Sequence, residues 1–300
     1  VPAVADDQWS RNDIDRFIHS GLAARGLAPS GPADPRTLAR RLFLDLTGLP
    51  PTPEEMRAFL EDPTDAGLDR LVDRLLTEEP YRTRFAERMT SPWLDLARYA
   101  DTSGIHMDAG RSIWLYRDWV IEAFRRNLPF DQFVTHQLAG DLIPDATVEQ
   151  VIASGFNRNH VTTDEGGAIS EEYLLEYAVD RANTTGEVFL GLTVGCARCH
   201  DHKFDPITAE DYYSLIAFFN NNEEPGIYSQ IPDATRALEP YIEVPDPDDR
   251  ILIDELDGEL AALRSEREHP TAQEVALITP FRASLRERGD WRWETPGVVS

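Results

Sequence analysis

The only two cysteines of this 300-residue chain lie in one short motif, Cys196-Ala197-Arg198-Cys199-His200. Two thiols about one helical turn apart can bond to the two vinyl groups of one porphyrin, and the adjoining imidazole can then bind its iron. The motif is therefore typical of covalent c-type haem attachment, with one haem per chain. It also constrains the fold, because 195 residues precede Cys196 in the chain, and the fold must place them so that the haem site remains accessible.

Three other interpretations of the motif remain open. In a thiol-disulfide redox module Cys196 would be the nucleophile, but that arrangement expects a strand before the motif within a βαβ unit. Residues 189–194 are a candidate for such a strand, yet strands and helices do not alternate around them. A zinc site usually has four ligands, and His160, His200 and His202 would have to complete it. A plain structural disulfide between the two cysteines is the third alternative.

Apolar residues recur at helical spacing through most of the first 222 residues. Asp34, Thr52 and Thr208 have the chemistry and position of helix caps, and Gly48 marks a helix end. Residues 183–186 are expected to interrupt a helix that begins at residue 170. We predict a mainly α, multi-helix domain over residues 1–222 that carries the haem motif. It is not expected to have the small cytochrome c fold, in which the motif lies near the start of the chain.

Residues 223–300 have a different character and are predicted to form a separate extension. Prolines are frequent at first, and the apolar pattern of residues 241–244 predicts a strand or two. Amphipathic patterns at residues 251–267 and 273–286 predict two helices, which we expect to form a helical hairpin. Residues 290–294 are expected to begin a β domain, so that the natural polypeptide would continue.

A polar run at residues 157–167 stands between helical segments and ends in two glycines. Buried loops must satisfy their backbone groups, so the polar side chains of this run are expected to line a pocket. His160 is the leading candidate for the second axial ligand of the iron. The alternative is a histidine that is hydrogen-bonded within the loop.

Several cationic side chains are candidate partners of the haem propionates, because they can form charge-assisted hydrogen bonds with carboxylates. They are Arg158, Arg181, Arg198 and Lys203, the last being the only lysine of the chain. For each arginine the alternative is an ordinary surface ion pair.

Charge excludes some classes of partner. The chain has 29 basic and 54 acidic residues, a net charge of -25, whereas nucleic acids and anionic membranes require cationic surfaces. No apolar run reaches the roughly 20 residues of a transmembrane segment. A signal-peptide pattern is not evident either, so we expect a mature or trimmed chain. Haem c is attached outside the cytoplasm, so the motif predicts a periplasmic or otherwise extracytoplasmic protein.

With these residues laid out, the chain resembles the planctomycete-type cytochrome c domain family, specifically its second cytochrome-like domain, long described as a domain of unknown function. The resemblance covers about residues 12–222. The matching runs are residues 14–18, 41–52, 93–101, 116–120, 137–142, 159–160, 164–167, 179–186 and 196–207.

The resemblance implies an exported protein in which Cys196, Cys199 and His200 hold the haem. It also matches His160 and His202 to family positions, so either one is a candidate distal ligand. Family members commonly join this domain to another cytochrome domain of the same polypeptide and to C-terminal β-sandwich and helical domains. Their genomic association with sulfatases and glycan-degrading enzymes implies an oxidative role on carbohydrates.

Three functions follow as hypotheses. The first is a c-type haem protein that transfers electrons to a redox partner protein or carries out haem-dependent oxidation, which leaves open whether it is an enzyme. The second is a thiol-disulfide redox module that uses Cys196 and Cys199. The third is a non-catalytic glycan-binding or assembly scaffold in which the motif is structural.

Overall fold

The computed structural model describes residues 1–4, 8–229, 237–269 and 272–287. The chain forms two compact units, Val1–Tyr241 and Ile242–Ser300, which are described separately. The described residues are mainly helical, as predicted, and contain no β-strand. The first unit extends beyond the boundary predicted after residue 222, because the segment that follows is hydrogen-bonded to the helical part of the unit.

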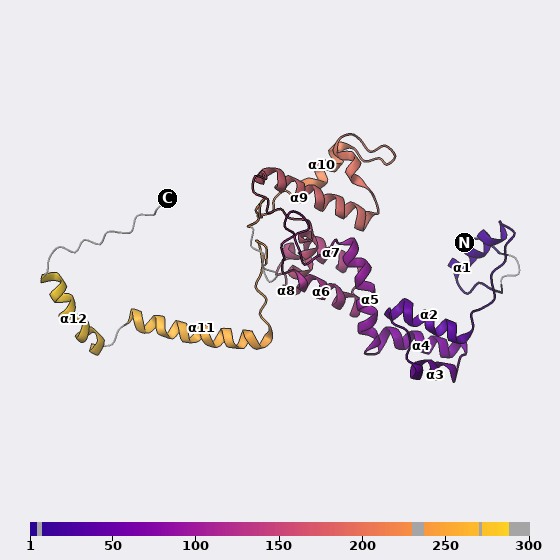
Figure 1. Ribbon diagram of the computed structural model, residues 1–300, viewed down its shortest axis with the longest axis horizontal. Coiled ribbons are helices and arrows are strands. Elements are labelled where there is room, and N and C mark those ends of the chain that lie inside the picture. The colour runs from indigo at the N-terminus through magenta and orange to yellow at the C-terminus, as the bar shows by residue number, and fades with distance from the viewer. Residues whose placement is uncertain (5–7, 230–236, 270–271, 288–300) are drawn as a thin grey trace. The chain divides into compact units, whose positions relative to one another are not determined.

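The helices of the first unit are drawn in Figure 1. In chain order they are α1 (Asp13–Ala23), α2 (Pro35–Thr47), α3 (Pro53–Leu60), α4 (Asp65–Thr77), α5 (Tyr81–Leu96), α6 (Trp114–Arg125), α7 (Phe130–Ala139), α8 (Val148–Ala153), α9 (Ser170–Thr185) and α10 (Ala209–Ala217). Short 3-10 or π turns join some of them: η1 (Gly140–Leu142), η2 (Ser154–Arg158), η3 (Gly186–Leu190) and η4 (Val194–Arg198).

Local side-chain chemistry determines where several of these helices begin and end. The Asp34 side chain accepts a hydrogen bond from a backbone amide in the first turn of α2. Thr52 and Glu55 form a reciprocal capping box at α3, and Thr208 starts the same arrangement at α10. Gly48 ends α2 in the left-handed conformation, with φ of 72°, which glycine adopts without a steric penalty. The predicted caps are confirmed.

The first of three apolar cores lies among α2, α3, α4 and α5. It is built around Phe43, Leu75 and Tyr81, all nearly inaccessible to solvent. The Tyr81 hydroxyl donates to Glu55, so the capping residue of α3 also ties that helix to α5. This core packs the four helices side by side (Figure 1).

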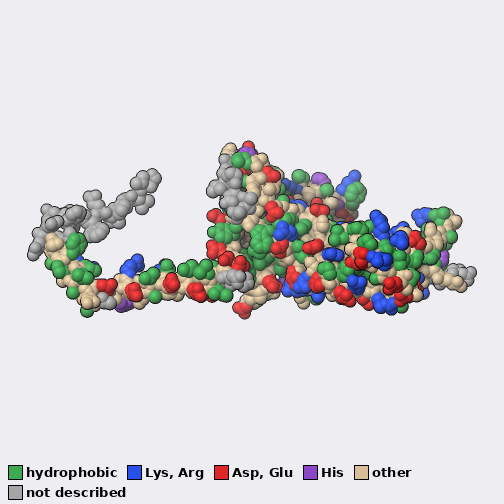
Figure 2. All heavy atoms as spheres, turned by 60° about the horizontal axis from the view of Figure 1, so that its bottom comes forward, with side chains coloured by type: hydrophobic (Ala, Val, Ile, Leu, Met, Phe, Trp, Pro, Cys, Tyr) green, Lys and Arg blue, Asp and Glu red, His purple; other side chains and the backbone are tan. Residues whose placement is uncertain are grey.

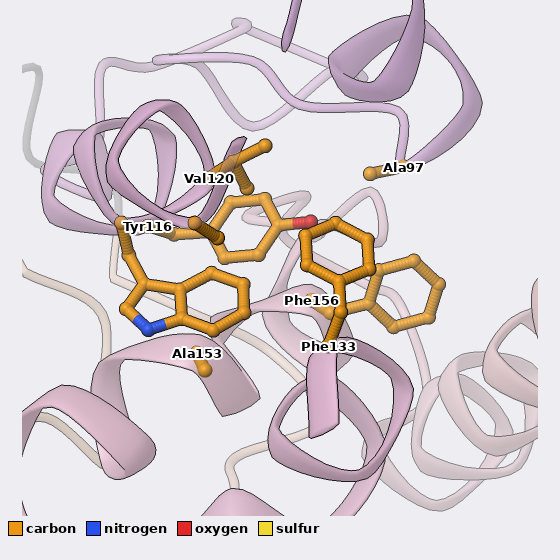
Figure 3. Close-up of a cluster of buried hydrophobic side chains, with 8 residues drawn as sticks. Ala97, Tyr116, Val120, Phe133, Ala153 and Phe156 are labelled. Carbon is orange, nitrogen blue, oxygen red and sulfur yellow. The ribbon is translucent and has the colours of Figure 1, made fainter. Parts of the chain in front are cut away.

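The second core is aromatic and lies among α5, α6, α7, α8 and η2 (Figure 3). Trp119 and Phe133 stack with ring centroids 5.5 Å apart. Gln137 is fully buried at its edge, where its side-chain oxygen accepts hydrogen bonds from Trp93 Nε1 at 2.9 Å and from the Tyr116 hydroxyl at 2.8 Å. One buried amide therefore satisfies two aromatic donors from different helices.

The third core joins α9, η4 and α10. Val179 and Ala182 of α9 pack against Val194 and Ala197, which flank the first cysteine of the motif. Tyr212 of α10 is also part of this core. The motif is thus fixed to the body of the unit through its small and apolar residues.

Two local predictions were wrong. Helix α9 is not interrupted at residues 183–186 but runs through Thr185 and passes into the π turn η3. Its polar residues are accommodated by partners, since Asn183 accepts from the Tyr212 hydroxyl and Thr184 donates to the Asp180 carbonyl. The strand predicted at residues 241–244 is not formed, because residues 237–246 have neither helix nor strand.

The described residues of the second unit form two helices, α11 (Pro247–Glu268) and α12 (Ala272–Glu287). Hydrophobic and acidic side chains are interspersed on the surface of α11 (Figure 2), and Leu256, Leu260 and Leu263 are exposed there. Both helices were predicted, and their packing as a hairpin stays a prediction. The β-like pattern at residues 290–294 lies outside the described residues. No helix in the described part of the chain is long and apolar enough to cross a membrane.

The buried amide of the second core gives a stability prediction. Replacing Gln137 with Leu leaves the Tyr116 hydroxyl proton without an acceptor and leaves Trp93 Nε1 only its 3.3 Å contact with the Tyr116 hydroxyl, at a cost of roughly 1 to 3 kcal/mol in the free energy of unfolding. Urea unfolding followed by tryptophan fluorescence measures this loss. Gln132→Leu, on the exposed side of the same helix, is the matched control. Equal stability of the two variants would contradict this role for Gln137.

Candidate functional site

The cysteines of the motif face outward from the third core. Cys196 lies in η4, while Val194 and Ala197 point inward to α9. Cys199 directly follows η4, three residues after Cys196. Both thiols are exposed and neither is in a disulfide. Both thiols are therefore accessible to a large planar molecule such as a porphyrin.

His200 is exposed beside the second cysteine, and one of its ring nitrogens is already engaged. Its Nδ1 lies 2.8 Å from the carbonyl oxygen of Asp201. A carbonyl can only accept, so the proton is assigned to Nδ1, which leaves the Nε2 lone pair for a metal. Histidines that bind a metal through one ring nitrogen usually donate such a hydrogen bond from the other.

The loop after His200 is held by its own polar groups. His202 Nδ1 accepts a hydrogen bond from the Asp205 amide at 2.9 Å, and the His202 amide donates to the Ile207 carbonyl at 2.8 Å. Asp201 accepts from the Ala209 amide at the start of α10. These bonds connect the motif to α10 by a short, closed turn.

Two of the four predicted propionate partners, Arg198 and Lys203, lie in the motif and three residues after it. Arg198 forms an ion pair with Glu176 of α9, with Nη1 3.0 Å from Oε2, and this hydrogen bond raises the pKa of the guanidinium. The Lys203 amine lies 5.1 Å from the centroid of the Phe204 ring. The Phe204 ring, four residues after His200 in the chain, is itself strongly exposed.

The other three predicted residues, Arg158, Arg181 and His160, meet at a residue that the sequence analysis missed. They surround the Glu224 carboxylate, whose side chain is only 2% exposed. Arg181 Nη1 lies 2.5 Å from Oε1, Arg158 Nη1 lies 2.8 Å from Oε2, and His160 Nε2 lies 3.3 Å from Oε2. We name these four residues the Glu224 cluster.

The charges of the Glu224 cluster explain its protonation. Burial alone raises the pKa of Glu224, but hydrogen bonds from its neighbours and the adjacent guanidinium charge outweigh it and hold that pKa well below its ordinary value. Burial lowers the pKa of His160. Arg181 Nη2 donates to His160 Nε2 at 2.7 Å, and His160 Nδ1 lies 2.9 Å from the Val161 carbonyl oxygen. His160 is therefore neutral, with its proton on Nδ1.

Arg111 holds the loop that presents His160. Its guanidinium is buried and donates to the carbonyls of Arg158, Asn159 and His160, at the C-terminal end of η2. Burial lowers the pKa of Arg111 to about 10, so it still carries its charge at neutral pH. A cation at this end of a helical turn is favoured by the partial negative charge of the free carbonyls.

Residues 223–229, which follow α10, are hydrogen-bonded to α9 and to the loop that carries His160. The Tyr177 hydroxyl donates to the Gly226 carbonyl at 2.9 Å, and the Tyr228 amide donates to the Thr163 carbonyl at the same distance. A Cβ at position 226 would collide with the Ser170 carbonyl oxygen, so the close approach requires glycine. Residues 223–229 are thus part of the helical unit.

A second histidine and carboxylate pair lies nearby. His106 Nδ1 is 2.7 Å from Asp164 Oδ1, and the Asp164 side chain is buried. The two loops that carry them are also joined by a hydrogen bond from the Thr162 amide to the Ser103 carbonyl. The polar run at residues 157–167 is therefore packed against a neighbouring loop and the Glu224 cluster.

Helix α9 separates the motif from the Glu224 cluster. Glu176 and Asn183 contact Arg198 and Tyr212 on the motif side. Tyr177 and Arg181 contact His160, whose ring centroid lies 4.6 Å from that of Tyr177. At 100° per residue, the two pairs of α9 residues project roughly 130° apart. The predicted residues thus form two groups, with Arg158, Arg181 and His160 away from the motif.

The motif group has the donor set that a c-type haem needs. Two accessible thiols are available for thioether bonds, and His200 has an oriented ring with Nε2 available. Arg198 and Lys203 are the cationic side chains beside them. Among the described residues, no group of three or more His, Cys, Asp or Glu side chains is placed to hold a metal ion alone.

These features define a class: a mainly helical domain that displays one C-x-x-C-H loop on its surface. The family comparison assigns the chain more narrowly. Residues 13–224 match the PSCyt2 family, described as a protein of unknown function (DUF1549), and the chain belongs to this family. No curated protein and no solved structure matches the chain.

Glu224 should be essential to the stability of this unit. Glu224→Gln removes the negative charge between Arg158 and Arg181, and leaving buried charges unpaired costs about 3 to 5 kcal/mol. Urea unfolding measures the loss, with Glu223→Gln as the exposed control. A loss no larger than that of the control would show that the cluster does not anchor the segment.

His160 should make stability depend on pH. Its folded-state pKa is below the ordinary value of 6.5, so the unfolded chain binds a proton that the folded chain does not. Its contribution is fully present above about pH 6.5 and is lost below it, by up to roughly 1.4 kcal/mol per pH unit. Urea unfolding at pH 7.5 and 5.5 measures this loss, and His160→Gln should reduce it. The same pH dependence in both proteins would contradict the assignment.

Proposed function

We propose that this domain is an extracytoplasmic c-type haem protein that acts in electron transfer or in haem-dependent oxidation. The observation that supports it most is the local geometry of the motif. Both thiols are exposed and unbonded, one within η4 and the other directly after it, and His200 Nδ1 is held by a backbone carbonyl. This combination prepares three neighbouring groups for one porphyrin and its iron.

Each residue of the motif then has a separate task. Cys196 and Cys199 would form the thioether bonds, and His200 would bind the iron through Nε2. Arg198 and Lys203 are the propionate partners that we retain. Arg198 is paired with Glu176, but that pair is about 40% exposed and its guanidinium can turn to a propionate, whereas Arg158 and Arg181 neutralise the buried Glu224 on the other side of α9. A bound haem supplies one-electron exchange at its iron.

Compartment and partners follow from the motif and from the family resemblance. Attachment of haem c requires an extracytoplasmic location, so we propose the periplasm or an equivalent compartment. The redox partner is a protein, for which another cytochrome domain of the same polypeptide is one candidate. A carbohydrate substrate and a link to glycan catabolism are proposed on the resemblance alone.

A thiol-disulfide function is the second candidate, because the free and exposed pair Cys196 and Cys199 would also suit it. The residues before the motif do not favour it. Residues 186–190 form a π turn, and no strand precedes the motif in the described residues, whereas the thioredoxin-like arrangement places the motif after a strand.

Intact-mass analysis of the full chain, produced in the periplasm of a host that matures c-type cytochromes, tests the proposal. The expected mass is that of the polypeptide plus one haem. The Cys196→Ser, Cys199→Ser double variant should lose covalent haem completely, because both thioether bonds are removed. His136→Gln, at a histidine that packs on Trp119, is the control and should retain the haem. A wild-type mass without haem, together with a reducible disulfide, would favour the thiol-disulfide function instead.

A further inference from the structure

We propose that neither His160 nor His202 binds the iron, and that the histidines of the first unit leave the sixth coordination position open to a small exogenous ligand. The inference rests on the proposed haem function and concerns the same site. It assigns structural roles to the two histidines. Three features of the chain support it: the short distance in sequence between His200 and His202, the hydrogen bonds of both His160 ring nitrogens, and the position of His160 on the other side of α9 from the motif.

Chain reach excludes His202. Two axial histidines approach an iron from opposite faces of the porphyrin, and each metal–nitrogen bond adds about 2 Å to the length of the side chain. Two residues of fully extended chain span at most about 7 Å. Because His202 is only two residues from His200, its ring cannot reach the opposite face. Its Nδ1 instead accepts the Asp205 amide hydrogen bond, which stabilises the turn after the motif.

The existing contacts of His160 account for both of its ring nitrogens. Nδ1 donates to the Val161 carbonyl, and Nε2 accepts from Arg181 while lying beside Glu224. The residue is 1% exposed. To bind iron it would have to leave Arg181, and its ring would have to cross from a packed interior to the motif. His160 is therefore a structural partner of the Glu224 cluster.

The position of α9 is the third feature. The motif is bonded to α9 through Arg198 and Glu176, whereas His160 contacts Tyr177 and Arg181, which project to another side of the helix. Because the helix backbone lies between these two sets of contacts, His160 cannot approach a haem held at Cys196 without unpacking α9. A pocket lined by the polar residues 157–167 would still lie on the other side of α9 from the motif.

Other histidines of the first unit are also engaged away from the motif. His19 packs on Trp9, His106 bonds to Asp164, and His136 packs on Trp119. Asp164 follows Thr163, whose amide donates to the Tyr177 hydroxyl, so the His106 pair belongs to the His160 side of α9. The contacts of these histidines therefore give none of them the role of sixth ligand.

An open position distinguishes two forms of the proposed function. A carrier that only transfers electrons usually keeps two protein ligands on its iron, whereas an open position permits ligand binding and oxidation chemistry. The motif lies on the surface and both of its thiols are exposed, so a small ligand has direct access. We therefore favour haem-dependent oxidation over electron transfer alone.

Absorption spectra of the full-length haem protein test the inference, with carbon monoxide as the probe ligand. Wild type should be high-spin in the ferric state, and the ferrous protein should bind one carbon monoxide per haem in a single step. His160→Gln and His202→Gln should leave the band positions and haem content unchanged. His160→Gln should lower the midpoint of urea unfolding. His136→Gln is the matched control.

A low-spin, six-coordinate spectrum in wild type would overturn the inference, and conversion to high-spin in one variant would identify the ligand. The wild-type spectrum decides the matter even if His160→Gln does not fold. A preparation whose intact mass lacks haem would instead overturn the proposed function, and this inference with it. The two failures are thus distinguished by mass and by spin state.

Discussion

A buried carboxylate between two guanidinium groups ties distant parts of the first unit together. Glu224 meets Arg158 from the end of η2 and Arg181 from α9, and both ion pairs are formed within 3 Å. A buried ion of either sign would be unstable alone, so each partner depends on the others. The neutral ring of His160 completes the packing. This cluster keeps residues 223–229, the polar loop and α9 in one arrangement.

That arrangement determines what the rest of α9 can do. One side of α9 packs against the Glu224 cluster. Another side packs against η4 and α10, and the C-x-x-C-H loop is exposed there. The apolar residues of the motif are used for packing, and its reactive residues remain outside. The physical basis of the proposed function is this division, in which stability and reactivity occupy different sides of one helix.

Features that depend on neighbouring residues could be predicted from the sequence. The caps at Asp34 and Thr52 need only a side chain and an amide three residues away, and the helical pattern gave the mainly α fold. The Glu224 cluster could not be found in this way, since its ion pairs join residues 43 and 66 positions apart. The two acidic residues after the asparagines at 220–222 were the available signal, but that stretch was interpreted as a domain boundary. Similarly, residues 183–186 have poor helix propensity, and only tertiary partners such as Tyr212 explain why α9 continues.

An experimental structure of the protein isolated with its haem tests the central claim most directly. The account predicts that the sulfur atoms of Cys196 and Cys199 are bonded to one porphyrin, that His200 Nε2 is bonded to the iron, and that His160 stays between Arg181 and Glu224. A disulfide between the two cysteines, or His160 bonded to the iron, would contradict it.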